Sequence, residues 1–133
     1  MSSALALAAM CATISPAIAC SPSFVAFEDG GAKLNAIDRA SVTAFAHEAR
    51  MLRYASIELV AQNDGSHAGR VMSQRRASSV RMELMRLGIP ADSIKIQFAS
   101  AATRLISGAG SARFVVMRPR PARAGATGTT PGC

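Results

Sequence analysis

Three regular patterns follow one another between residues 56 and 98, and together they most constrain what this chain can fold into. Residues 56–60 and 93–98 alternate polar and apolar side chains, which is the period of a β-strand with one buried face. Between them, residues 70–87 carry apolar side chains at helical spacing, and Gly88 and Pro90 follow, as they commonly do after a helix end. The segment therefore predicts a strand, a helix and a second strand in succession.

Weaker patterns on both sides complete the expected order of elements. Residues 24–27 and 114–117 are short aromatic and β-branched runs, which predict an opening and a closing strand. Asn35 is a good N-cap for a helix over 36–53. Residues 61–69 and 99–112 are rich in small residues and predict loops. The resulting order, βαβαββ, predicts an α+β fold with two helices packed on one face of a mixed sheet.

The two ends of the chain differ in composition from its middle. Residues 1–19 contain no charged residue and combine an apolar run with the small-residue triplet 17–19, which is typical of a secretory signal and its cleavage site. An uncleaved anchor helix is the alternative, but Pro16 interrupts the ~20 strongly apolar residues that a membrane span needs. Residues 119–133 are rich in Pro, Gly, Thr and Arg and predict a disordered basic tail. We expect a signal peptide at 1–19, a domain at 20–118 outside the cytoplasm, and this tail.

The cysteines leave three alternatives open. Cleavage after residue 19 removes Cys11 and makes Cys20 the first residue of the mature chain, while Cys133 is the last. Cys20 is a candidate for lipidation, or for a disulfide with Cys133 in an oxidising compartment. Two free thiols, or pairing between chains, are the third alternative.

Composition excludes several classes of function. The 133 residues hold 15 Lys and Arg against 8 Asp and Glu, a net charge of +7 that is compatible with nucleic-acid binding. However, the arginines of the second predicted helix form no single stripe, and aromatic residues make up only 5% of the chain, so we expect no nucleic-acid partner. His47 and His67 have no companions at metal-ligand spacing, and the neighbours Asp64, Ser66 and His67 are too close in sequence to form a catalytic triad. We expect no enzyme activity, no metal and no cofactor.

One arginine breaks the apolar pattern of the second predicted helix. Arg76 stands four residues after Met72 and four before Val80, where the stripe calls for an apolar side chain. A guanidinium at such a position either extends to the helix edge or is buried with partners, since an unpaired buried charge costs several kcal/mol. The nearest acid on the N-terminal side of Arg76 is Asp64, which lies in the loop that enters the helix. The pair predicts either an internal salt bridge or a site for a zwitterionic ligand, whose carboxylate the arginine grips with two hydrogen bonds.

The same helix resembles a motif of the OmpA-like C-terminal peptidoglycan-binding domains. That motif has the form Asn-x-x-Leu-Ser-x-x-Arg-Ala-x-x-Val-x-x-x-Leu. Residues 87–94, with the sequence Leu-Gly-Ile-Pro-Ala-Asp-Ser-Ile, are also similar to the family, as are the opening run 24–34 and the closing run 113–116. The positions of the helix motif that match are Ser73, Arg76, Ala77, Val80 and Leu84, with Met72 for the leucine.

The resemblance implies a non-catalytic periplasmic domain that binds the meso-diaminopimelate of the peptidoglycan peptide stem. It assigns the ligand's amino and carboxylate groups to Asp64 and Arg76. The further binding residues that we expect are Asn63, Gly65 and His67 of the loop, and Arg113. The outer membrane and other envelope proteins are the additional partners that it suggests.

The binding loop departs from the family's pattern, because it is shorter between Asp64 and Arg76 than is usual in the family and differs at two positions. Ala61 stands where the family has a glycine, and Gly69 stands where it has the asparagine of the helix motif. Both changes act on the backbone that presents amide groups to a ligand. The alternative function is therefore an OmpA-like fold that has lost peptidoglycan binding and serves as an interaction module in the envelope.

Overall fold

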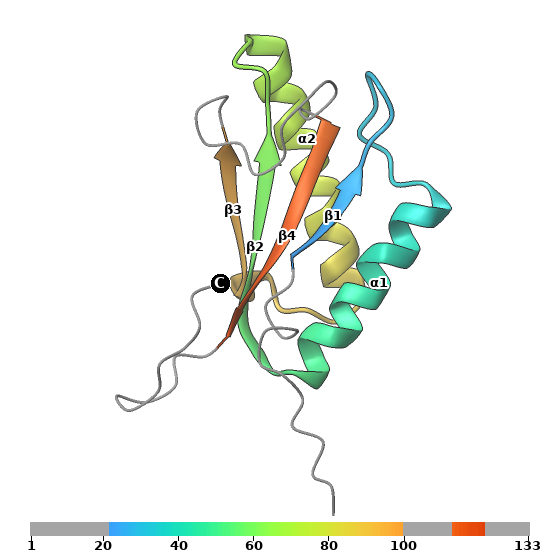
Figure 1. Cartoon of the computed structure of the whole chain (residues 1–133), viewed down its shortest axis with the longest axis vertical. Helices are drawn as coiled ribbons and strands as arrows, with labels where there is room; N and C mark the ends of the chain where they lie inside the picture. The colour runs from blue at the N-terminus through green and yellow to red at the C-terminus, as the bar shows by residue number, and fades with distance from the viewer. Residues whose placement is uncertain (1–21, 100–112, 122–133) are drawn as a thin grey trace, which may run out of the picture.

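The computed structural model of the chain describes residues 22–99 and 113–121 (Figure 1). The expected signal peptide, both cysteines of the mature chain and residues 122–133 of the expected tail lie outside the described residues. No helix within these two ranges is both long and apolar enough to cross a membrane. The elements in chain order are β1 (Ser23–Ala26), α1 (Ala36–Met51), β2 (Tyr54–Gln62), α2 (His67–Arg86), the short 3-10 helix η2 (Ala91–Ser93), β3 (Ile94–Ala99) and β4 (Phe114–Pro121).

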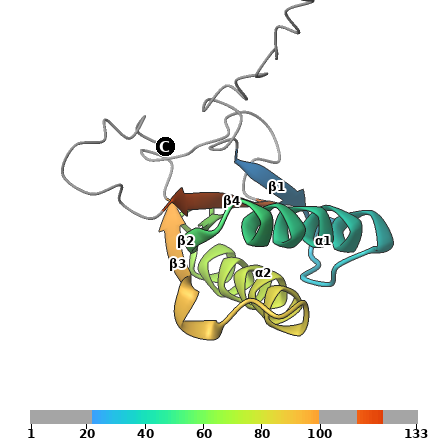
Figure 2. The same ribbon diagram turned by 90° about the horizontal axis from the view of Figure 1, so that it is seen from below.

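The four strands form one mixed sheet in the order β1-β4-β2-β3. β2 and β3 run parallel and are joined by α2, whereas β4 inserts between β1 and β2 and is antiparallel to both. Figure 2 shows both helices on the same face of the sheet. The α+β class and the βαβαββ order expected from the sequence are confirmed.

Caps explain where the helices begin and end. Asn35 Oδ1 accepts a hydrogen bond from the amide of Asp38 at 2.8 Å, and Asp38 Oδ2 accepts one from the amide of Asn35 at 3.4 Å, so α1 starts at the predicted residue. α1 ends at Met51, before the predicted residue 53, because Arg53 adopts the left-handed conformation with φ 51°. α2 ends at Arg86 before Gly88, which has φ +94°.

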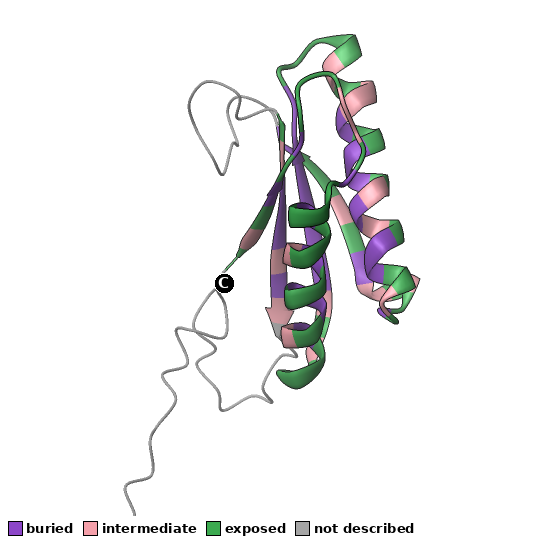
Figure 3. Ribbon diagram, turned by 90° about the vertical axis from the view of Figure 1, so that its right-hand side faces the viewer, coloured by how far each residue is buried: buried purple, intermediate pink, exposed green. Residues whose placement is uncertain are grey.

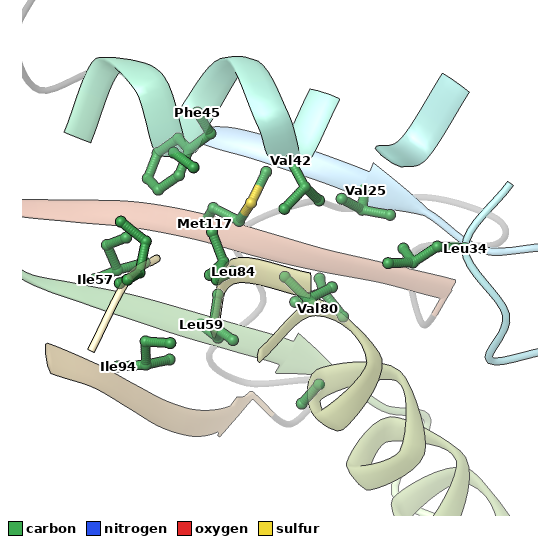
Figure 4. Packing of buried hydrophobic residues seen from close by; sticks show 14 of the residues in the cluster. Val25, Leu34, Val42, Phe45, Ile57, Leu59, Val80, Leu84, Ile94 and Met117 are labelled. Carbon is green, nitrogen blue, oxygen red and sulfur yellow. The ribbon is translucent and has the colours of Figure 1, made fainter. Parts of the chain in front are cut away.

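The core lies between the sheet and the two helices. Figure 3 shows buried residues along the strands and on the side of α2 that faces the sheet, and Figure 4 shows Phe45, Val80 and Leu84 from the helices packed against side chains of the strands. The central side chains of this cluster are buried: Val25, Val42, Phe45, Ile57, Leu59, Val80, Leu84, Ile94, Val115 and Met117. Their burial fixes the orientation of α2, and with it the direction in which Arg76 points.

β4 continues beyond its predicted end. Its pairing with β2 runs to Arg120 and Pro121, which lie opposite Ser56 and Tyr54. Because β1 pairs only with residues 114–117, one edge of β4 has no neighbour among the described strands past that point, and prolines without an N–H can be accommodated there. The predicted domain boundary at 118 is therefore wrong by at least three residues, and the first residues of the expected disordered tail belong to the sheet.

Candidate functional site

Arg76 is buried in the structure, with only 5% of its surface exposed. Its Nε donates to the carbonyl of Gly31 at 2.8 Å, and its Nη2 donates to the carbonyl of Glu28 at 3.1 Å. The guanidinium also lies 5.7 Å from the centre of the Phe27 ring, within the range of a cation–π contact. The sequence left two alternatives for Arg76, extension to the helix edge or burial with partners, and the structure shows burial with partners. These partners include backbone carbonyls from the segment after β1.

The two carbonyls that Arg76 contacts are the ends of one tight turn. The amide of Gly31 donates to the carbonyl of Glu28 at 3.1 Å, and Gly30 in the turn has φ +69°. Arg76 thus fastens both ends of the turn 28–31 to α2. The turn glycines are visible in the sequence, but nothing there indicates that the turn meets a helix more than forty residues away.

The pKa of Arg76 is lowered overall, and burial and two neighbouring charges act on it in different directions. Burial lowers the pKa of Arg76, the negative charge of Asp29 raises it, and the positive charge of Arg113 lowers it further. A guanidinium nevertheless stays protonated in a protein. Asp29 is therefore an acid that stabilises the buried charge of Arg76, and sequence patterns did not single it out.

The loop between β2 and α2 is organised by its own side chains. Asp64 Oδ1 accepts hydrogen bonds from the amide of Ser66 at 2.9 Å and from its Oγ at 2.6 Å. Ser66 Oγ in turn accepts from the amide of Gly69 at 2.9 Å and caps α2. Asn63 Oδ1 accepts from the amide of Gly65, which has φ +88°. These bonds explain why α2 begins at His67, three residues before the predicted start, and why the predicted loop over 61–69 is shorter in the structure.

Gly69 fits this arrangement because it lacks a side chain. A Cβ at this position would overlap the Asp64 carboxylate and touch Ser66 Oγ. The departure from the motif at Gly69 is thus coupled to the placement of Asp64, which lies over the first turn of α2. An asparagine at position 69 would exclude this position of the carboxylate.

Asp64 and Arg76 line one open pocket at the end of the sheet where α2 begins. Figure 1 shows that the loop before α2, the turn after β1 and the start of β4 all lie at this end. The pocket has a volume of about 260 Å³. Its walls combine two acids, two arginines, Met72 and small residues: Asp29, Gly30, Asp64, Ala68, Gly69, Met72, Arg76 and Arg113.

The structure separates the predicted binding residues into two groups. Asp64, Arg76 and Arg113 come together on the pocket, although they derive from three different segments. Asn63, Gly65 and His67 are not among its walls: Asn63 is buried, Gly65 supports the turn, and His67 is the exposed first residue of α2. The local sequence around Asp64 was therefore a poor guide to the other walls.

A larger hollow, of about 720 Å³, lies between the segment 32–34 before α1, the first turn of α1 and the second half of α2. Its charged walls include Glu83 and Arg86, which pair with each other at 2.5 Å. None of the predicted site residues lines it. No group of three or more His, Cys, Asp or Glu within residues 22–99 and 113–121 is placed to hold a metal ion.

Solved structures resemble this fold. The OmpA-like domain of FopA1 from Francisella tularensis has a TM-score of 0.65 at 17% identity, over 75% of this chain and 72% of that one. The peptidoglycan-associated lipoprotein from Burkholderia pseudomallei has a TM-score of 0.61 at 18% identity, over 73% and 89%. The cell wall anchor of the T6SS from Pseudomonas aeruginosa has a TM-score of 0.61 at 13% identity, over 80% and 90%. No protein-family model and no curated protein sequence matches the chain.

Proposed function

From the premise that the chain has the fold of the OmpA-like domains, we propose that it is a non-catalytic envelope protein that binds the peptide stem of peptidoglycan. The observation that carries the proposal is the shared pocket of Asp64 and Arg76, the two residues that the family motif assigns to the ligand. Two of the similar structures are those of a peptidoglycan-associated lipoprotein and of a cell wall anchor, which favours the same function here.

The pocket offers complementary chemistry for meso-diaminopimelate. The free end of this residue carries an ammonium and a carboxylate on one carbon atom. An acid accepts hydrogen bonds from the ammonium, and an arginine donates to the carboxylate. The volume of about 260 Å³ suits one amino-acid head group, and Met72 provides an apolar surface for its aliphatic chain. Within this proposal Arg113 offers a second cation to the remaining carboxylates of the stem.

The proposal includes a location in the periplasm, which the signal peptide expected from the sequence favours. Lipidation of Cys20 would attach the domain to a membrane, and a disulfide with Cys133 would join its ends; both stay predictions. A loop whose acid is engaged by the helix cap favours the alternative function, in which the fold has lost the ligand and docks to another envelope protein.

Co-sedimentation of the mature chain with purified sacculi tests the proposal. We expect the wild type to pellet with sacculi and Asp64→Asn to pellet much less, because asparagine keeps an oxygen for Ser66 but removes the charge. Asp92→Asn is the matched control, since Asp92 is exposed in η2 and does not line the pocket. A wild type that stays in the supernatant, where a known OmpA-like domain pellets, would contradict peptidoglycan binding and favour the interaction module.

Replacing Gly69 with alanine is expected to weaken sacculus binding severalfold while changing the free energy of unfolding by no more than about 1 kcal/mol. The new methyl group displaces the Asp64 carboxylate, whereas alanine is the better helix former. Binding and chemical denaturation of the variant measure the two effects separately.

A double-mutant cycle shows whether the Gly69 effect passes through Asp64. In an Asp64→Ala background the methyl group has no carboxylate to displace, so adding Gly69→Ala should leave binding unchanged. An additional loss of binding in that background would contradict the explanation.

A further inference from the structure

Asp29 lies at the centre of the turn that Arg76 fastens. Glu28 and Gly31, which flank the Asp29-Gly30 pair, are the two residues whose carbonyls accept hydrogen bonds from the guanidinium. The turn is closed by its own hydrogen bond from Gly31 to Glu28. Asp29 therefore lies on a short segment held at both ends, and it is one of the residues that line the charged pocket.

Asp64, the acid that the family resemblance assigns to the ligand, accepts hydrogen bonds within its own loop. Asp64 Oδ1 accepts two hydrogen bonds from Ser66, at 2.9 and 2.6 Å, and these bonds organise the start of α2. Asp29 is exposed, and its charge acts on the buried guanidinium of Arg76. An acid and an arginine that are electrostatic neighbours on one pocket match a ligand whose ammonium and carboxylate share a carbon atom.

We propose that Asp29 binds the ammonium group of the zwitterionic head group in this pocket, at least as strongly as Asp64 does. The proposal rests on the proposed function and assigns a ligand-binding residue that the family motif does not supply. Arg76 then has two roles: it faces the ligand's carboxylate and holds the turn that presents Asp29. The loop with Asp64, on the other side of the pocket, then acts mainly in capping α2.

Calorimetric titration of the mature chain with the tripeptide L-Ala-γ-D-Glu-meso-diaminopimelate tests the assignment. We expect Asp29→Asn to lose roughly tenfold or more in affinity, the size typical of a hydrogen bond to a charged group. Asp64→Asn should lose no more than Asp29→Asn does, and the control Asp92→Asn should bind as the wild type does. Circular dichroism and thermal melting of each variant establish that the exposed turn tolerates the change.

A second probe separates a contact with the ligand from a structural effect. When the free amino group of the diaminopimelate is acetylated, the ammonium is gone, and Asp29→Asn should bind this probe as well as the wild type does. If the loss caused by Asp29→Asn persists with the acetylated tripeptide, Asp29 acts through the fold, and the assignment is overturned.

The remaining outcomes distinguish the role of Asp29 from the proposed function. Binding of the unmodified tripeptide by Asp29→Asn within about twofold of wild type, together with a large loss for Asp64→Asn, overturns the role of Asp29 and leaves the proposed function standing. A wild type that binds neither the tripeptide nor sacculi overturns the proposed function, and the assignment of Asp29 with it.

Discussion

Replacing Arg76 with alanine is expected to destabilise the domain by about 3 kcal/mol and to abolish ligand binding at the same time. The substitution removes the donors to the carbonyls of Glu28 and Gly31, and it deletes the contact with Phe27. It also leaves space at a site where the side chain was only 5% exposed. The turn 28–31 loses its fastening to α2, so the pocket loses the wall that carries Asp29.

Chemical denaturation measures this loss, and Arg76→Lys is the matched comparison. Lysine keeps the charge, but a compact ammonium cannot reproduce the planar donors that reach two carbonyls, so we expect an intermediate loss of stability. An Arg76→Ala variant within about 1 kcal/mol of wild type would show that the two hydrogen bonds contribute little to the fold. Since the variant alters stability and pocket together, loss of binding in it is weak support for ligand contact. The isosteric acid variants Asp29→Asn and Asp64→Asn are the sharper tests.

The sequence predicted one half of this site and missed the other for a physical reason. The break in the apolar stripe at Arg76 is a local signal, and it correctly indicated a guanidinium that must find partners. Those partners include the backbone carbonyls of Glu28 and Gly31, and because every residue has a backbone carbonyl, the sequence does not identify them. Only the packing of β1 and α2 on one sheet brings them together, so Asp29 acquired a role that no local pattern indicates.

The order of elements was more predictable because it depends on periodicity. α1, α2 and the strands β2 and β3 carry strong alternation or helical stripes, and each appears near its expected position. Boundaries failed where a few hydrogen bonds decide them. Ser66 and Asp64 start α2 early, and Arg53 stops α1 early. The end of the closing strand was missed for another reason: Pro is rare in strands, and the Pro, Gly, Thr and Arg content of the last residues predicted a disordered tail.

Contacts with β2 stabilise this last part of β4. Arg118 and Arg120 lie over Glu58 of β2, at 3.3 and 2.7 Å from its carboxylate oxygens, and only 5% of Glu58 is exposed. Pro119, opposite Ile57, is among the fully buried side chains. An ion cluster and a buried proline of this kind depend on the register of two strands that are far apart in the sequence.

A chain shortened to end at Arg118 is therefore expected to be less stable than one ending at Pro121 by about 3 kcal/mol, chiefly because the buried Pro119 and the pairing of the strand end with β2 are lost. The lost ion pair of Arg120 contributes the smaller part. For a domain of this size the difference corresponds to a melting temperature lower by roughly 10 °C or more. Thermal unfolding of the two shortened chains measures it.

Arg120→Ala in the chain ending at Pro121 separates the two contributions. This variant keeps the strand and removes the guanidinium that donates to the Glu58 carboxylate at 2.7 and 3.0 Å. Because this arginine is 40% exposed, the variant should recover most of the stability that the shorter chain loses. Equal melting temperatures for the two shortened chains would mean that residues 119–121 add nothing to the sheet. If Arg120→Ala is instead as unstable as the chain ending at Arg118, the ion pair with Glu58, rather than the pairing and burial of the strand end, fixes the last residues of β4.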